Sequence, residues 1–201
     1  HFRGLGLRIA GDPAQGWCFT HPSDTAGIHL EWADKGWDFD PRFGAALPER
    51  RCEPRLDPPR VAWFGALVRD PAAALAVLQR LWPAVVLFED GAAPLSEPAA
   101  AVSLGDAVLA LYRLPQDPEQ QARLWGPLPL RPRMHLMALR VRELEAAREA
   151  LAAEGVRVLR EDPERALLLA HPDDSHGLLL AFSARDLPGD PRGALSASGR
   201  R

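Results

Sequence analysis

An imidazole and a carboxylate stand at alternate positions of the otherwise apolar segment 27–32. His29 and Glu31 are separated by one residue, and alternate residues of a β-strand point to the same face of a sheet. A carboxylate that becomes buried needs a partner, and a metal ion is one group that can supply it. Glu31 is therefore a candidate metal ligand, and His29 is a candidate substrate-binding residue beside it. The alternative is an edge strand whose polar face is in contact with water.

Two amphipathic helices are predicted, each among strand-like segments. Asp70 and Pro71 provide an N-cap and a first helical residue, and Pro83 ends the first helix. Residues 143–154 predict the second helix, which Gly155 terminates. Each helix belongs to a unit with the order strand, helix, strand, strand, strand. The predicted strands are 60–68, 84–89 and 101–114 (broken at Gly105) for the first unit, and 134–141, 156–159, 166–170 and 177–182 for the second.

The N-terminal segment contains only the last three strands of such a unit, at residues 5–10, 16–20 and 27–32. It lacks the opening strand and helix, so we expect the chain to be the later part of a longer protein. Proline-rich segments predict the linkers, with five prolines each in residues 33–59 and 115–132. The expected organisation is the C-terminal part of a first domain (1–32), a linker (33–59), a second domain (60–186, with units 60–115 and 133–186) and a disordered tail (187–201).

A repeat links the first and last units. Residues 21–27 read His-Pro-Ser-Asp-Thr-Ala-Gly, and residues 171–177 read His-Pro-Asp-Asp-Ser-His-Gly, at an offset of 150 residues. Turn chemistry alone explains this segment, because proline keeps the preceding histidine extended, Asp and Ser/Thr bond the local backbone, and glycine accepts a positive φ. We therefore expect a loop that joins two strands and assign no chemistry to His21 or His171.

These units, with His-Pro-x-Asp-Thr/Ser-x-Gly before a last apolar strand, resemble the vicinal oxygen chelate superfamily. That superfamily includes glyoxalase I, methylmalonyl-CoA epimerase, bleomycin-resistance proteins and extradiol dioxygenases. Residues 21–32 are most similar to the final hairpin of the epimerase branch. The resemblance implies an α+β fold in which tandem βαβββ units pair into half-barrel cups. It also implies a divalent metal (Zn, Fe, Mn, Co or Ni) inside a cup, held by the first and last strands of each unit.

The resemblance places Glu31 at the position of the metal-binding carboxylate in the first domain. In the second domain, the four equivalent positions carry side chains that do not bind metals: Trp63, Ala110, Leu136 and Ala181. His135 lies one residue from a ligand position and faces the other way, unless a one-residue bulge turns it inward. We therefore expect a metal in the first domain and none in the second. The second cup is then either a structural partner or an apolar binding site with Trp63 as a substrate-binding residue.

The leading functional hypothesis is a metal-dependent enzyme that acts on a small molecule in the first domain. The resemblance implies isomerase or lyase chemistry, in which a proton next to a carbonyl is removed and the metal holds the enolate. Extradiol ring cleavage, which uses Fe(II), is a variant. The alternative is a metal-free protein that binds or sequesters a small molecule, as bleomycin-resistance proteins do.

Composition narrows the partners. The chain has 24 Lys and Arg against 27 Asp and Glu, a balance that argues against a dedicated nucleic-acid binder. No apolar run approaches 18 residues, so we expect no membrane span and a cytoplasmic protein. Cys18 and Cys52 are too few for a disulfide scaffold and are expected to be reduced, with a single disulfide as the alternative. The resemblance also suggests a homodimer.

Overall fold

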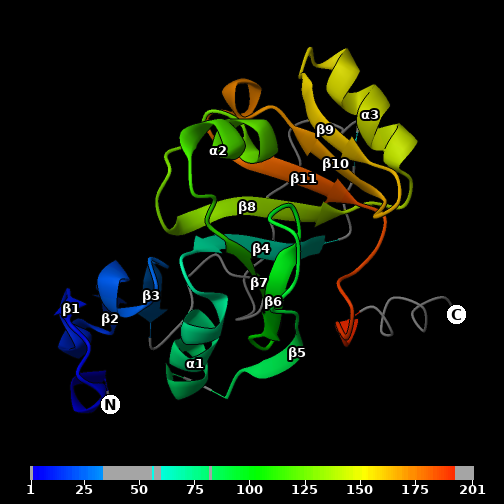
Figure 1. The fold of residues 1–201 in the computed structure, drawn as a ribbon. Coiled ribbons are helices and arrows are strands. Elements are labelled where there is room, and N and C mark those ends of the chain that lie inside the picture. Colours follow the sequence, from blue (N-terminus) through cyan, green and yellow to red (C-terminus); the bar gives the residue numbers. More distant parts are fainter. Residues whose placement is uncertain (1, 34–55, 57–59, 82, 193–201) are drawn as a thin grey trace, which may run out of the picture.

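The computed structural model describes residues 2–33, 56, 60–81 and 83–192 of the 201-residue chain. Their strands form a large eight-stranded sheet in the order β5-β6-β7-β4-β8-β11-β10-β9 and a three-stranded sheet in the order β1-β2-β3 (Figure 1). Most of the predicted linker 33–59, including Cys52, lies outside the described residues. No helix of the described residues is long and apolar enough to cross a membrane.

The large sheet consists of two βαβββ units joined edge to edge. The first unit comprises β4 (Arg60–Val68), α1 (Pro71–Leu81), β5 (Val85–Glu89), β6 (Pro98–Ser103) and β7 (Val108–Arg113). The second comprises β8 (Arg133–Arg140), α3 (Leu144–Ala153), β9 (Val158–Asp162), β10 (Leu167–Ala170) and β11 (Leu179–Ser183). The first strands, β4 and β8, pair antiparallel at the centre, and each is parallel to the last strand of its own unit. The predicted fold class, paired βαβββ units of the glyoxalase-like type, is confirmed.

Both predicted helices form where the sequence places them. The Asp70 carboxylate accepts a hydrogen bond from the backbone N–H of Ala73 at 3.0 Å, which caps α1, and α1 ends at Leu81. Helix α3 starts after Glu143, whose side chain makes no capping bond. The two helices cover one face of the sheet with separate apolar clusters, which contain Leu75 and Leu78 under α1 and Ala147 and Leu151 under α3.

A third helix, α2 (Pro118–Trp125), lies within the segment that the sequence analysis predicts as the linker 115–132. The Asp117 carboxylate accepts from the Gln120 N–H at 2.7 Å, Pro118 is the first helical residue, and Gly126 ends the helix. The prediction of a linker without a helix is wrong here. The helix is easily overlooked because it is short and buries only two residues, so its sequence has almost no apolar stripe. The Asp-Pro signal that identified α1 would also have identified α2.

The other face of the sheet carries an apolar cluster that both units share, here called the cup cluster. Trp125 at the end of α2 is its one large side chain from outside the two units. Its buried members are Ala62, Trp63, Leu67, Ala101, Val108, Ala110, Tyr112, Trp125, Leu136, Ala138, Leu167, Leu169, Leu179 and Ala181.

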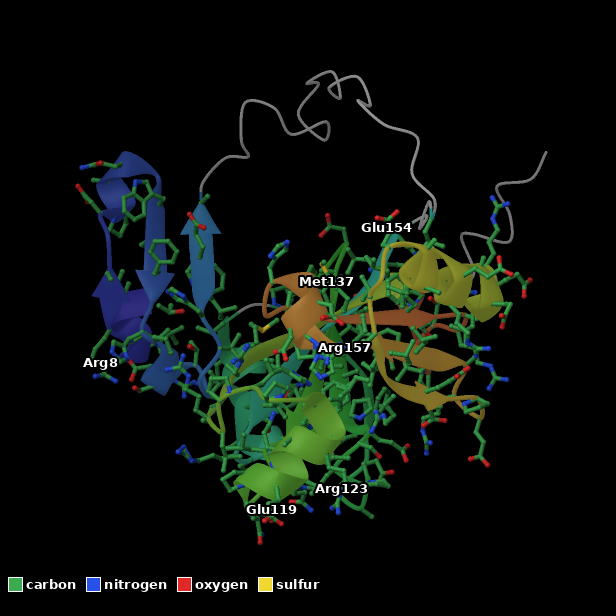
Figure 2. All side chains as sticks on the ribbon, turned by 90° about the horizontal axis from the view of Figure 1, so that it is seen from above. Arg8, Glu119, Arg123, Met137, Glu154 and Arg157 are labelled. Carbon is green, nitrogen blue, oxygen red and sulfur yellow. The ribbon has the colours of Figure 1, made fainter. Side chains whose placement is uncertain are left out.

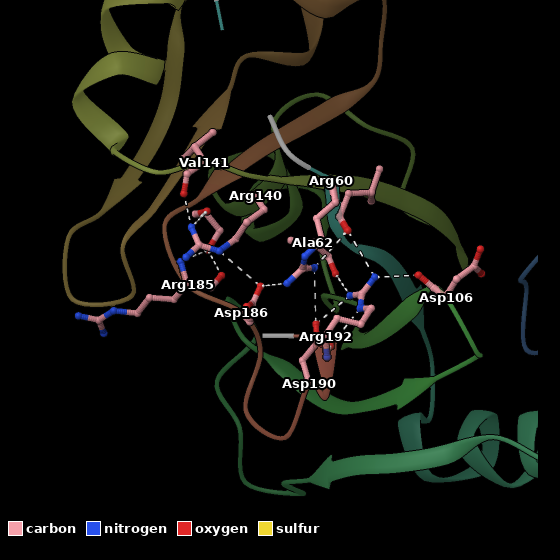
Figure 3. A network of polar contacts seen from close by, with 11 residues as sticks. Arg60, Ala62, Asp106, Arg140, Val141, Arg185, Asp186, Asp190 and Arg192 are labelled. Carbon is pink, nitrogen blue, oxygen red and sulfur yellow. Dashed lines mark hydrogen bonds and ion pairs between the residues drawn. The ribbon is translucent and has the colours of Figure 1, made fainter. Parts of the chain in front are cut away.

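Residues 184–192, here called the C-terminal strap, pack against the large sheet, so the predicted disordered tail does not begin at residue 187. Arg192 donates to the carbonyl oxygens of Ala62 and Asp106 and to the Asp190 carboxylate (Figure 3). Arg60 forms ion pairs with Asp186 and Asp190. These partners are up to 130 residues apart, so local composition could not reveal them.

The three-stranded sheet of β1 (Ile9–Ala10), β2 (Trp17–Thr20) and β3 (Leu30–Ala33) lies to one side of the large sheet (Figure 2). The predicted strand 5–10 is reduced to Ile9–Ala10, and Leu5 ends a 3-10 helix that starts at Phe2. This sheet has the register of the last hairpin of the second unit. Phe19 pairs with Glu31, and Leu169 pairs with Ala181, at the offset of 150.

The loop before each of these last strands also repeats its contacts. The Arg8 side chain and N–H bind the Asp24 carboxylate, and the same groups of Arg157 bind Asp174. Both His-Pro segments form a 3-10 turn in which the histidine Nδ1 accepts a backbone N–H. The strand-joining loop is as expected, and the histidine side chain caps its turn, a contact that the sequence pattern does not predict.

Close packing around Gly65 of β4 leaves no room for a side chain. Register shifts between Gly65 and Ala66, which leaves His135 of β8 as an unpaired, bulged residue. A Cβ on Gly65 would lie 2.9 Å from the Leu136 Cβ and 3.0 Å from the His135 Cε1. The bulge and the missing Cβ together provide the space for the imidazole.

We expect Gly65→Ala to lower the free energy of unfolding by about 1–3 kcal/mol, because the added methyl overpacks this site. Denaturant unfolding measures the change. Gly91→Ala is the matched control, since its Cβ would meet nothing within 4 Å and its φ is not positive. Equal stability of the two variants would show that the central strands relax to accept a side chain.

Candidate functional site

The cup of the second domain presents the four positions at which the resemblance would place metal ligands. Trp63, Ala110, Leu136 and Ala181 all belong to the cup cluster and are at most 4% exposed. None of these side chains carries a lone pair that can bind a divalent ion. The described residues contain no group of three or more His, Cys, Asp and Glu side chains that could hold a metal. The residues of this cup therefore do not fit a metal centre.

The bulge in β8 turns His135 into the cup. The imidazole is 2% exposed, and its ring centroid lies 5.1 Å from that of Tyr112 and 4.8 Å from that of Trp125. Its Nδ1 lies 3.0 Å from the Gly65 carbonyl oxygen. Because a carbonyl only accepts, Nδ1 carries the hydrogen and Nε2 presents a lone pair. Burial lowers the pKa of His135 from 6.5 to about 3, so the ring is neutral at ordinary pH.

Trp63 and Tyr112 form a hydrogen-bonded aromatic pair on the cup floor. The Trp63 Nε1–H donates to the Tyr112 hydroxyl oxygen at 3.1 Å. Burial raises the pKa of Tyr112 above its usual value, so the hydroxyl keeps its hydrogen. Because the oxygen accepts from Trp63, that hydrogen remains for an acceptor placed beside the pair.

A cavity of about 460 Å³ opens beside this pair, here called the mouth cavity. The C-terminal strap, the loop between β5 and β6 and the turn between β9 and β10 surround it. Phe88, Leu167 and Leu187 add to its apolar lining. An ion pair between Glu97 and Arg165 joins the loop of the first unit to the turn of the second. The cavity thus lies at the junction of the two units and the strap.

The predicted site residues His29 and Glu31 lie elsewhere, on the three-stranded sheet. Both are exposed, on the same face of the sheet as Trp17 and Phe19. The His29 ring lies 5.1 Å from that of Phe19. Glu31 is not buried by the described residues, because β3 is an edge strand whose face is in contact with water. The need of a buried carboxylate for a partner therefore does not apply to it here. The counterparts 150 residues later, in contrast, are all members of the cup cluster: Leu167, Leu169, Leu179 and Ala181.

Sequence reasoning missed three residues of the cup: Tyr112, Trp125 and Arg160. Tyr112 stands on a predicted strand, but its partner Trp63 is 49 residues away. Trp125 falls on the unpredicted helix α2. Arg160 pairs across the sheet with Leu169 and therefore shares the cup face, and its guanidinium carbon lies 5.3 Å from the centroid of the Trp125 ring. Strand alternation is the signal that could have found Tyr112 and Arg160.

Comparison with known proteins supports the fold. No protein-family model and no curated protein sequence matches the chain. A hypothetical protein, BH1468 from Bacillus halodurans, matches with 15% identity and a TM-score of 0.50 over 65% of this chain and 98% of that one. Streptomyces coelicolor methylmalonyl-CoA epimerase, in complex with 2-nitronate-propionyl-CoA, matches with 21% identity and a TM-score of 0.50 over 64% and 100%.

Methylmalonyl-CoA epimerase from Mycobacterium tuberculosis is a further structural neighbour, with 19% identity and a TM-score of 0.49 over 74% of this chain and 97% of that one. The two matches with a TM-score of 0.50 support a glyoxalase-like fold for this chain. At these identities the likeness extends to the fold alone.

The depressed pKa of His135 makes stability depend on pH. Between about pH 3 and pH 6.5 the unfolded chain binds a proton at this residue and the folded chain does not. The contribution of His135 to the free energy of unfolding is therefore fully present above pH 6.5. It falls by about 1.4 kcal/mol for each pH unit between pH 6.5 and about pH 3. Asp24 and Asp174, whose pKa values are held at about 2 by Arg8 and Arg157, contribute at lower pH.

We expect His135→Gln to remove this component between pH 4.5 and 6.5, as measured by denaturant unfolding at a series of pH values. His29→Gln, outside the cup, is the control and should keep the loss of stability on the acid side. A wild-type profile that is flat in this range would mean that His135 is protonated in the folded chain.

Proposed function

We propose that residues 60–192 bind a small organic molecule in the mouth cavity without a metal. The observation that carries this proposal is the cavity of about 460 Å³ beside the Trp63–Tyr112 pair. Its size falls within the roughly 300–1,000 Å³ of typical small-molecule sites, which are mostly apolar with a few polar groups. The cup cluster that forms its floor carries no metal ligands at the four positions where the superfamily places them.

The lining indicates the ligand's chemistry. Trp63, Phe88, Leu167 and Leu187 offer apolar contact, and the Tyr112 hydroxyl offers one hydrogen-bond donor. A ligand with an apolar body and a carbonyl oxygen satisfies both. Acyl-CoA thioesters, diketones and catechols are the classes to screen, and the acyl-CoA class is included because the S. coelicolor epimerase is complexed with a propionyl-CoA analogue.

We expect Leu187→Ala to weaken binding of a ligand found in this screen by about tenfold, because the shorter side chain loses the apolar contacts of about two to three carbon atoms. Thermal shift identifies the ligand, and isothermal titration measures the affinity. Leu178→Ala is the matched control, since Leu178 is exposed and lies outside the cavity. Equal affinities of the two variants, or no ligand in any class, would reject the mouth cavity as the site.

A second candidate is a metal-dependent reaction at the three-stranded sheet. The observation that favours it is the gathering of Trp17, Phe19, His29 and Glu31 on one open face, at positions whose counterparts line a cup. Glu31 would be one ligand of a divalent ion, and the other ligands would come from outside the described residues. A metal there would polarise a substrate carbonyl for isomerase or lyase chemistry, or bind oxygen donors of a catechol.

Metal analysis of the purified full-length protein tests this candidate. We expect close to one equivalent of a divalent metal in the wild type and less than about one-tenth in Glu31→Gln, because the carboxylate supplies a charged ligand. Glu149→Gln, on the exposed side of α3, is the control. Less than about one-tenth equivalent in the wild type would exclude a metal at Glu31 and would leave the mouth cavity proposal unaffected.

A further inference from the structure

Three polar side chains lie around the Trp125 indole, and each of these four residues has at least one polar atom without a hydrogen-bond partner in the described part of the chain. Gln121, Trp125 and His135 are at most 2% exposed. The atoms without partners are the Trp125 Nε1, the His135 Nε2, both amide atoms of Gln121, and the Nε and one terminal nitrogen of Arg160. None of these four residues lines the mouth cavity, so this group is a separate feature.

Packing brings the four together. The Trp125 ring lies against His135 at 4.8 Å and against the Arg160 guanidinium carbon at 5.3 Å. Gln121 precedes Trp125 by one helical turn and so shares its side of α2. Buried polar groups in folded proteins are nearly always paired, so a cluster without partners indicates a missing polar occupant.

The charge of the group selects an anion. Burial lowers the pKa of Arg160, yet no carboxylate of the described residues lies within ion-pair distance of its guanidinium. Asp162 attracts the Arg160 guanidinium from a longer distance and so lowers the cost of burying its charge. The Asp162 carboxylate is itself bound by the Arg165 side chain and N–H. Arg160 is half-buried, and a partly desolvated cation without a counter-charge is costly.

We propose that a small hydroxycarboxylic acid binds beside Trp125, between α2 and the cup. One guanidinium balances one carboxylate, and the indole N–H and the amide N–H groups supply further donors to its oxygens. The His135 Nε2 and the Gln121 Oε1 are acceptors that a carboxylate cannot satisfy, whereas a hydroxyl hydrogen can satisfy one of them. A monocarboxylate with a neighbouring hydroxyl therefore pairs with more of these groups than a plain monocarboxylate does, and phosphate brings more negative charge than the one cation balances.

Lactate is the probe, and propionate, phosphate and chloride at equal ionic strength are the comparisons. We expect lactate to raise the Tm by about 5–10 °C at a hundred times its Kd, and to shift the Trp125 indole N–H signal in spectra of ¹⁵N-tryptophan-labelled protein. Trp125→Phe assigns that signal. Propionate should act at least tenfold more weakly, because it leaves the acceptors unsatisfied.

Arg160→Met should abolish the lactate effect and, in buffer without organic acids, should unfold at the wild-type temperature or above it, because it removes an unpaired charge. Arg123→Met, on the exposed side of the same helix (Figure 2), should respond to lactate like the wild type. A clear loss of Tm in Arg160→Met without acid would mean that Arg160 already has its partner within the protein. The absence of a lactate shift, or equal shifts with chloride or propionate, would also overturn the proposal and identify buried water as the occupant.

Discussion

The antiparallel pairing of β4 with β8 joins the two units and sets their orientation within the large sheet. Because each of these strands is also parallel to the last strand of its own unit, the faces of both units turn toward one shared interior. The pairing is irregular at Gly65, and this irregularity turns His135 inward. A regular ladder would have placed an aliphatic residue and an imidazole on opposite faces, as the sequence pattern alone predicts.

The four positions at which the resemblance would place metal ligands carry side chains that bind no metal, and two polar features adjoin them. The Trp63–Tyr112 pair borders the mouth cavity. Trp125 lies among polar atoms that have no hydrogen-bond partner within the described residues. Tyr112 belongs to both, since its ring contacts Trp125 and its residue lines the cavity. Polar groups thus remain in the interior although the four positions at which the resemblance would place metal ligands carry none.

Much of the fold was predictable because its signals are local. The Asp70–Pro71 start, the strand alternation and the His-Pro turns each depend on neighbouring residues, and both predicted helices and the strands of both units formed, whereas the predicted strand 5–10 is reduced to Ile9–Ala10. The C-terminal strap and the bulge at Gly65 were not predictable, because they depend on contacts between residues far apart in sequence. For the candidate site, the resemblance indicated that Trp63 faces the cup, whereas the exposure of Glu31 depends on what covers its sheet.

The ion pair between Glu97 and Arg165 closes the rim of the mouth cavity from opposite units. Arg165 is 44% exposed, so dissolved ions reach this contact and screen it within a Debye length of about 8 Å at physiological ionic strength. The attraction across the rim therefore weakens as salt is added, while the apolar floor is unaffected. The rates at which a molecule enters and leaves the cavity would then depend on ionic strength more strongly than its affinity for the apolar floor does.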